Sequence, residues 1–336
     1  MKDYMMKYKK ITGKSVWNGS DVQDKKSWTW YMPSNSLMEI DENILRIENK
    51  KLNIDQIKID DFRLKSIESE LKKLRNSIDS GLGFQIIKGI PVKKYSYQQL
   101  RIMLWGLSLH FGQPLPQTKL GELFIDVRNE GGDVNQNMRG YHSLKHLPFH
   151  TDGGHIVGLF CLEQSSAGGL SLLASSAAIH NAILAEDPEL LDYLYEGFPM
   201  DRRGAEPDGE PRLSPWNLPI FSFKEGRLSC VYDRRSSEWG MDRAGRTMPV
   251  KAIAALDFFD KLTQNQDLQL SMQLEPGDLQ LVNNFSVIHS RTSFQDDADA
   301  GKLRHLLRIW IDSPKFKQNA INKLHLYTRQ PLPESI

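Results

Sequence analysis

The 336-residue sequence has little of what would tie it to a membrane or an oxidising compartment. Its two cysteines, Cys161 and Cys230, are too few for a disulfide framework, and both lie in apolar segments typical of buried strands. No segment approaches the ~20 apolar residues that a membrane-spanning helix requires. Residues 1–14 are polar and rich in lysine, unlike a secretory signal. These absences predict a soluble, cytoplasmic protein with reduced thiols.

An excess of charge of one sign is missing as well. The formal net charge is +1, so we expect neither nucleic acid nor an anionic membrane as a partner. Hydrophobic residues make up 40% of the chain and charged residues 25%, which is ordinary for a globular protein.

The hydrophobic pattern predicts an α+β protein that is mainly β. Residues 1–58 have no sustained period and are interpreted as an extension packed on the body, and residues 59–336 as one domain. Helices are predicted from Asp60 to Gly81 and from Ser96 to Gly112. The predicted strands are Phe84–Ile90, Leu123–Val127, Ile156–Leu162, Leu170–Ala174, Ile220–Phe223, Leu228–Tyr232, Leu279–Ile288 and Arg304–Ile311, with further helices at 175–185, 188–195 and 250–262. This order favours a double-stranded β-helix, or jelly roll, with flanking and inserted helices.

A His-x-Asp pair is the first candidate site. On an extended segment, His150 and Asp152 leave the same face. The motif has low specificity in a chain with nine histidines, and the alternative is a loop histidine beside a turn aspartate. His289, at the end of a predicted strand, could equally be structural. Together, two imidazoles and a carboxylate on one face of a metal are the arrangement of non-haem Fe(II) oxygenases.

Two arginines near the carboxyl end form the second candidate site. Arg304 and Arg308 are four residues apart on a predicted strand, so they share a face with Leu306 and Trp310. Burying two guanidinium groups is costly unless each meets an anion, and a carboxylate is the natural partner. The alternative is an internal pair with Asp or Glu. The opposite face, which includes Leu307, is expected to pack on helices.

A glycine pair precedes the third candidate. Gly168 and Gly169 let the backbone pass close to another group, and Ser171 offers a hydroxyl at the start of the next strand. Without the other motifs, Ser171 would be interpreted as a turn serine.

The order of these motifs, with Gly277-Asp278 and Asn284 between them, resembles the Fe(II)/2-oxoglutarate dioxygenases of the taurine dioxygenase and 2,4-dichlorophenoxyacetate dioxygenase (TauD/TfdA) family, which are clavaminate synthase-like. The resemblance covers about residues 80–312. It implies that Fe(II) is held by the residues of the His-x-Asp pair and by the distal histidine, namely His150, Asp152 and His289.

The resemblance also implies how two acids bind. Arg304, assisted by Ser171, would hold 2-oxoglutarate, and Arg308 would face the primary substrate. Apart from the resemblance, Gln117 and Arg234 lie on segments that could line the mouth of the site and bind the substrate, and a surface or core role is the alternative for each. The gap of 15 residues between the distal histidine and Arg304 is longer than in taurine dioxygenase. If the intervening loop differs in conformation, Arg308 would hold 2-oxoglutarate instead.

The implied reaction uses dioxygen to oxidise, and by default to hydroxylate, an unactivated C–H bond of a small acid, an amino acid or an amino-acid-derived metabolite. Two alternatives remain. A zinc hydrolase would use His150, Asp152 and His155, with water activated by the metal. A non-catalytic barrel would bind a small acid through Arg304 and Arg308.

Overall fold

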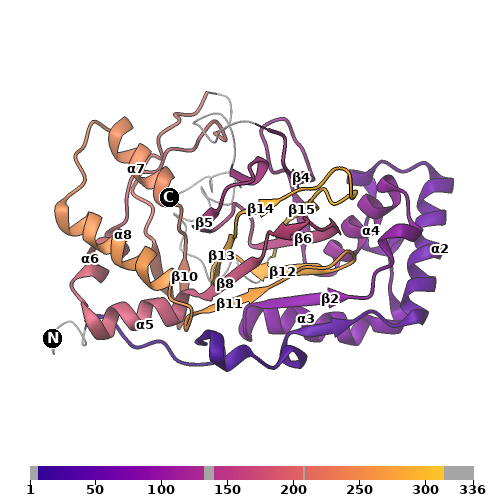
Figure 1. Cartoon of the computed structure of the whole chain (residues 1–336), viewed down its shortest axis with the longest axis horizontal. Helices are drawn as coiled ribbons and strands as arrows, with labels where there is room; N and C mark the ends of the chain where they lie inside the picture. Colours follow the sequence, from indigo (N-terminus) through magenta and orange to yellow (C-terminus); the bar gives the residue numbers. More distant parts are fainter. Residues whose placement is uncertain (1–6, 132–139, 207–208, 314–336) are drawn as a thin grey trace.

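Two β-sheets form the body of the protein in the computed structural model, which describes residues 7–131, 140–206 and 209–313 (Figure 1). The seven-stranded sheet has the order β1 (Thr29–Tyr31), β2 (Phe84–Lys88), β12 (Leu279–Asn283), β6 (Ile156–Glu163), β15 (His305–Asp312) and β3 (Gln113–Leu115), with β4 (Ile125–Arg128) also paired to β15. The four-stranded sheet has the order β11 (Gln269–Met272), β8 (Ser171–Ser175), β13 (Val287–Arg291) and β5 (Leu147–His150). The strand pairs in these sheets are antiparallel except β1 with β2.

Helices lie at both ends of this body. In Figure 1, α2 and α4 lie at the right, α3 below β2, and α5 to α8 towards the left. The bounds are α2 (Ser34–Lys50), α3 (Glu68–Ser80), α4 (Tyr97–Leu109), α5 (Ser176–Glu186), α6 (Leu190–Glu196), α7 (Arg234–Arg243) and α8 (Val250–Thr263). Two further ribbons pair β9 (Phe221–Lys224) with β10 (Arg227–Cys230) and β7 (Ala167–Gly168) with β14 (Phe294–Gln295). No helix of the described residues is long and apolar enough to cross a membrane.

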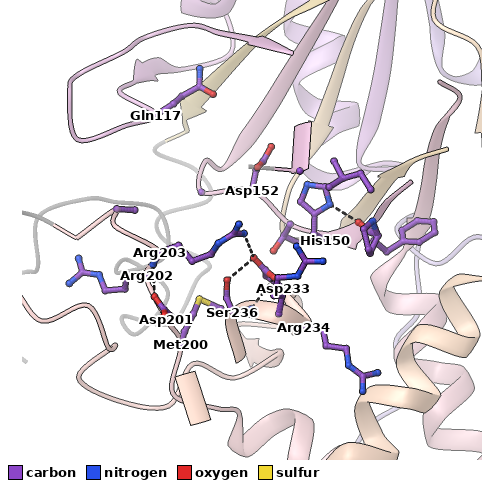
Figure 2. Close-up of a pocket in the computed structure, with 18 of the residues that line it drawn as sticks. Gln117, His150, Asp152, Met200, Asp201, Arg202, Arg203, Asp233, Arg234 and Ser236 are labelled. Carbon is purple, nitrogen blue, oxygen red and sulfur yellow. Dashed lines mark hydrogen bonds and ion pairs between the residues drawn. The ribbon is translucent and has the colours of Figure 1, made fainter. Parts of the chain in front are cut away.

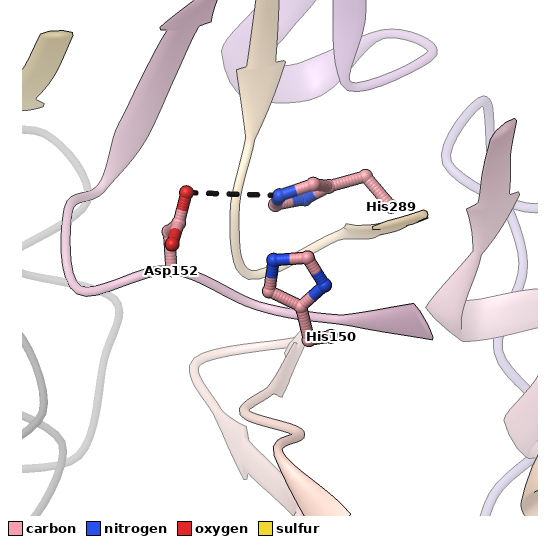
Figure 3. Close-up of side chains that lie close together, drawn as sticks. All are labelled: His150, Asp152 and His289. Carbon is pink, nitrogen blue, oxygen red and sulfur yellow. Dashed lines mark ion pairs between the residues drawn. The ribbon is translucent and has the colours of Figure 1, made fainter. Parts of the chain in front are cut away.

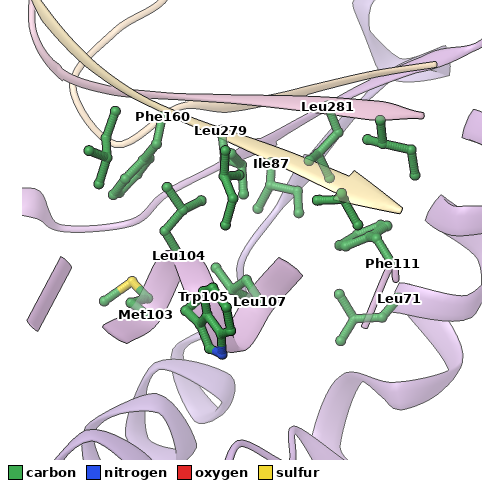
Figure 4. Packing of buried hydrophobic residues seen from close by; sticks show 14 of the residues in the cluster. Leu71, Ile87, Met103, Leu104, Trp105, Leu107, Phe111, Phe160, Leu279 and Leu281 are labelled. Carbon is green, nitrogen blue, oxygen red and sulfur yellow. The ribbon is translucent and has the colours of Figure 1, made fainter. Parts of the chain in front are cut away.

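The alternation of side chains on β15 shows how the layers are filled. Leu306 packs between the two sheets, in a cluster with Leu173 of β8 and Val287 of β13. Leu307 and Ile309 point the other way, into the cluster covered by α2, α3 and α4. Figure 4 shows that cluster, with strand residues lying over α4. Leu306 and Arg308 alternate with these residues on β15, and Arg304, just before the strand, lines the same small cavity as both, as the sequence predicts.

Several predicted elements have different bounds. Ser96 caps α4 as expected, accepting the Gln99 N–H bond, but the helix ends at Leu109 rather than at Gly112. The helix predicted from Asp60 begins at Glu68, because the preceding residues form two short 3₁₀ turns. Apolar residues such as Phe62 are buried from these turns and imitate a helical period.

Two expectations are wrong. Leu279–Ile288 is not one strand: a turn at residues 284–286 separates β12 from β13, which belong to different sheets. The amino-terminal segment does carry a period, since Ile40, Ile44 and Ile47 form the buried face of α2. The polar residues between these isoleucines obscure the pattern. Residues 1–6 of the predicted extension and residues 314–336 of the predicted domain lie outside the described residues.

Candidate functional site: a histidine pair and a carboxylate between two cavities

The central feature is the pairing of β5 with β13. These antiparallel strands place His150 and His289 directly opposite each other, and the centroids of their rings are 4.5 Å apart. Asp152 follows β5 and lies 3.7 Å from Nε2 of His289 through its Oδ2 atom (Figure 3). One ligand atom from each of the three residues lies within 4.8 Å of the others. The structure thus brings together the predicted metal residues, which are distant in the sequence.

The protonation of His150 suits a metal ligand. Its Nδ1 lies 2.8 Å from the carbonyl oxygen of Pro148. A carbonyl only accepts, so Nδ1 carries the proton and Nε2 keeps a free lone pair. Desolvation, helped by the charge of His289, lowers the pKa of His150 to about 4. The imidazole is therefore neutral near pH 7, the form that binds divalent metals.

Backbone contacts fix the loop that carries Asp152. The side chain of Asn284, in the turn between β12 and β13, accepts the N–H bond of Asp152 at 2.9 Å and donates to the carbonyl of Gly154 at 2.8 Å. Thr151 is tied to Tyr232 twice, because its N–H donates to the Tyr232 carbonyl at 2.7 Å and its Oγ1 accepts the Tyr232 N–H at 2.9 Å. Sequence reasoning missed Thr151 because it concentrated on the flanking ligands.

Asp152 is also paired with Arg308. Nη1 of Arg308 lies 3.1 Å and 3.2 Å from the two carboxylate oxygens, and both side chains are largely buried. Desolvation alone would raise the pKa of Asp152, but the charge of Arg308 and the hydrogen bond with His289 hold it far below its usual range. The carboxylate is therefore ionised. The alternative considered for Arg308 from the sequence, an internal ion pair with an Asp or Glu, is therefore present.

Gln117 holds Arg308 in this position. Its Oε1 accepts the Nε–H bond of Arg308 at 2.8 Å, and its Nε2 donates to the Arg308 carbonyl at 2.9 Å and to the Leu123 carbonyl at 3.0 Å. Gln117 lines a cavity but is itself 2% exposed. Two of its hydrogen bonds orient Arg308.

A small inner cavity of about 40 Å³ adjoins the three predicted metal residues. Ser171 and Arg304 line it, as do His150, Asp152, His289 and Arg308. Arg304 is 6% exposed and burial lowers its pKa to about 10, so it remains charged near pH 7. A Cβ atom on Gly169 would lie 3.0 Å from Nε of Arg304, which is the close approach expected of the glycine pair. Ser171 donates to Oε1 of Gln280 at 3.0 Å.

The loop before Arg304 is compatible with Arg304 lining the inner cavity. Asp297 and Lys302 exchange backbone hydrogen bonds, and Asp296 accepts the Arg304 N–H bond at 2.8 Å. The long gap is therefore folded back on itself. Arg304 lines only the inner cavity, whereas Arg308 lines both cavities.

The outer cavity, of about 730 Å³, shares His150, Asp152 and Arg308 with the inner one. Figure 2 shows Gln117 at one side of this cavity and Arg202, Arg203 and Ser236 at another. Arg234 lines this cavity too, but its guanidinium is bound by Glu238, Asp257 and Asp260 at 2.7–2.8 Å. Its predicted role in substrate binding competes with these three carboxylates.

His155 contacts residues outside the group of candidate ligands. Its Nδ1 accepts the Ser313 N–H at 3.1 Å and lies 2.6 Å from Oδ1 of Asp312, and its ring packs on Phe285. Among the described residues it belongs to no group that could hold a metal. The geometry therefore favours His289 as the third ligand.

Two imidazoles and one carboxylate that converge from one side define a class of proteins, the mononuclear non-haem iron enzymes. Comparison of the sequence gives the family. The pattern described as "Taurine catabolism dioxygenase TauD, TfdA family" matches residues 48–310, and the chain belongs to this family. It is an Fe(II)- and 2-oxoglutarate-dependent dioxygenase that uses dioxygen.

Similar proteins agree with this assignment. FR-33289 synthase from Streptomyces rubellomurinus is 32% identical over 315 residues, which cover 92% of each chain. The structure of asparagine oxygenase with Fe(II), 3-hydroxyasparagine and succinate has a TM-score of 0.66 at 16% identity, over 85% of this chain and 94% of that one. The iron oxygenase OrfP with Fe and α-ketoglutaric acid has a TM-score of 0.61 at 16% identity, with the same coverage. This chain shares their fold.

Proposed function

We propose that His150, Asp152 and His289 hold Fe(II). The observation that carries this proposal is the register of β5 and β13, which sets the two histidines opposite each other beside the carboxylate. The neutral imidazole of His150 and the ionised Asp152 supply the donors that a divalent iron ion prefers.

Arg304 and Ser171 are the proposed contacts of the distal carboxylate of 2-oxoglutarate. Both line the inner cavity next to the metal residues, and the guanidinium of Arg304 is buried there. With iron, 2-oxoglutarate and dioxygen bound, the site supplies the oxidising power to replace a C–H bond by a C–OH bond. The side chains of this protein orient the acids and exclude water.

The proposed substrate is an amino acid or a small acid derived from one. Arg308 supports this choice, because it presents a positive charge where the outer cavity meets Asp152. Asparagine oxygenase and OrfP, whose structures carry hydroxyasparagine and hydroxyarginine, share the fold. Gln117 would affect this substrate indirectly, by orienting Arg308. Arg234 would contribute as part of the wall of the outer cavity.

We further propose that the two sheets form a double-stranded β-helix, that residues 59–336 are one catalytic domain, and that residues 1–58 are an extension packed on it. The antiparallel sheets, joined by a shared apolar cluster, support the first point. The pairing of β1 with β2 and the burial of α2 in the helix-covered cluster support the last.

The test is an anaerobic titration of metal-free protein with Fe(II) and then 2-oxoglutarate, followed by visible absorption. We expect the charge-transfer band of an iron-chelated keto acid, and its loss in His289→Ala. His305→Ala is the matched control, because this histidine pairs with Asp126 outside the predicted metal group. Release of succinate with a panel of amino acids then identifies the substrate.

The alternatives give other results. A zinc hydrolase built on His155 would retain its metal in His289→Ala and would give no band. A non-catalytic barrel would bind 2-oxoglutarate with the same affinity whether or not iron is present.

A further inference from the structure

Arg291 is a buried cation that the proposed reaction leaves without a role. It lies two residues after His289 on β13, and therefore on the same face of the strand. Its partners across the sheet are Ser171 of β8 and Leu147 of β5. Arg291 is 4% exposed and lines the inner cavity. The sequence analysis did not single out Arg291, although its position two residues after His289 would place both side chains on one face of a strand.

Only part of this guanidinium is engaged. Nη2 donates to the carbonyl oxygens of Ser143, at 2.7 Å, and Lys145, and Nε donates to the Thr292 carbonyl at 3.2 Å. Nη1 is buried and has no hydrogen-bond partner within the described residues. One side of the group thus holds the segment before β5, and Nη1 remains available.

Arg304 has the same property. Its Nη1 is also buried without a hydrogen-bond partner in the described part of the chain. The guanidinium carbons of Arg291 and Arg304 lie 4.7 Å and 5.2 Å from the ring centroid of Phe294, so both groups pack on one aromatic ring. Two cations held together in a buried cavity are costly unless an anion lies against them.

A carboxylate fits both the charge and the space. Its two oxygens have about four acceptor positions, enough for donors from two guanidinium groups. A cavity of about 40 Å³ has room for roughly three water-sized groups, and a carboxylate has three non-hydrogen atoms. Ser171 lines the same space opposite Arg291.

We propose that Arg291 is a second co-substrate-binding residue, whose Nη1 donates, together with Arg304, to the distal carboxylate of 2-oxoglutarate. It makes the site selective for keto acids with a second carboxylate. This inference rests on the proposed function. The competing role of Arg291 is to anchor the backbone at Ser143 and Lys145 alone.

Binding of two keto acids separates these roles. 2-Oxoglutarate and 2-oxopentanoate have the same chain length, and only the former carries the distal carboxylate. In Arg291→Gln, measured anaerobically with Fe(II) by the charge-transfer band, we expect the Kd of 2-oxoglutarate to rise about 10- to 100-fold, the range of charge-assisted hydrogen bonds. The Kd of 2-oxopentanoate should change less than about threefold, since that acid lacks the carboxylate that the lost donor would bind.

The controls make the outcome decisive. Arg128→Gln removes an exposed arginine and should leave both affinities unchanged. Arg291→Lys keeps the charge and should preserve part of the preference for 2-oxoglutarate, which also serves if Arg291→Gln does not fold. An equal loss of both keto acids, or no loss, would overturn the role of Arg291. No band with either acid in the unaltered protein would instead overturn the proposed function.

Discussion

Arg308 and Asp152 form a buried ion pair in which one guanidinium nitrogen reaches both carboxylate oxygens, at 3.1 Å and 3.2 Å. The carboxylate is the one proposed to bind iron, and Arg308 lies within hydrogen-bond distance of both of its oxygens. Arg308 keeps Asp152 ionised and in place while the metal is absent, and it must share the carboxylate once a metal binds.

This pair predicts how metal and stability are linked. In Arg308→Leu, the buried carboxylate of Asp152 loses its arginine partner, and metal-free protein should lose about 3–5 kcal/mol of stability. Fe(II) restores a partner, so its addition should raise the Tm of the variant more than that of the unaltered protein. Thermal unfolding with and without Fe(II) measures both effects. Arg308→Lys, which keeps a cation, is the control, and equal metal-induced shifts in Tm would contradict the expectation.

Thr151 should affect both stability and metal affinity. Thr151→Val removes the Oγ1 atom that accepts the buried N–H bond of Tyr232. The unsatisfied donor should cost about 1–3 kcal/mol in urea unfolding. Because the flanking residues are the proposed ligands, the affinity for Fe(II) should fall about tenfold.

The conservative variant Thr151→Ser is the comparison. It keeps the hydroxyl and loses one methyl group, so its Fe(II) affinity should stay close to that of the unaltered protein. If Thr151→Ser loses Fe(II) affinity as Thr151→Val does, the methyl contact rather than the hydrogen bond positions this segment.

Replacing Gly106 in α4 by alanine should destabilise the protein, although the same change inside a helix usually stabilises it. Alanine in place of glycine inside a helix ordinarily stabilises by about 1 kcal/mol. Here a Cβ atom would lie 2.1 Å from the ring of Phe62, which is fully buried. We expect Gly106→Ala to destabilise by about 1–3 kcal/mol, measured by urea unfolding. An unchanged midpoint would mean that Phe62 moves aside at little cost.

The two cysteines should be unreactive in the folded protein. Burial raises the pKa of Cys161 to about 12 and also raises that of Cys230. At pH 8, below the folded pKa, the thiolate of Cys161 is about 10⁻⁴ of the total, and the thiolate is the reactive form. A disulfide exchange reagent should label neither thiol in native protein and both in denaturant. Rapid labelling of the native protein at pH 8 would show that one thiol is accessible.

The sequence alone determined features that depend on neighbouring residues. The period of two from Arg304 to Ile311 places both arginines on one face because strand side chains alternate, and the structure has that face between the sheets. Likewise, Ser96 caps a helix through contacts three residues away, and glycine opens the space beside Arg304. The order of motifs identified the family, which the comparison confirms.

Only the tertiary structure decided which distant residues meet. A run of apolar residues does not show to which sheet each part of it belongs. The turn at Asn284, which separates β12 and β13 into different sheets, was therefore predicted as part of one continuous strand. The register that sets His150 opposite His289 is a long-range pairing, fixed by the packing of both sheet faces. The pairing of Asp152 with Arg308, and the approach of Arg291 to Arg304, join residues of one sheet to residues carried by the other, so they depend on how the two sheets pack face to face.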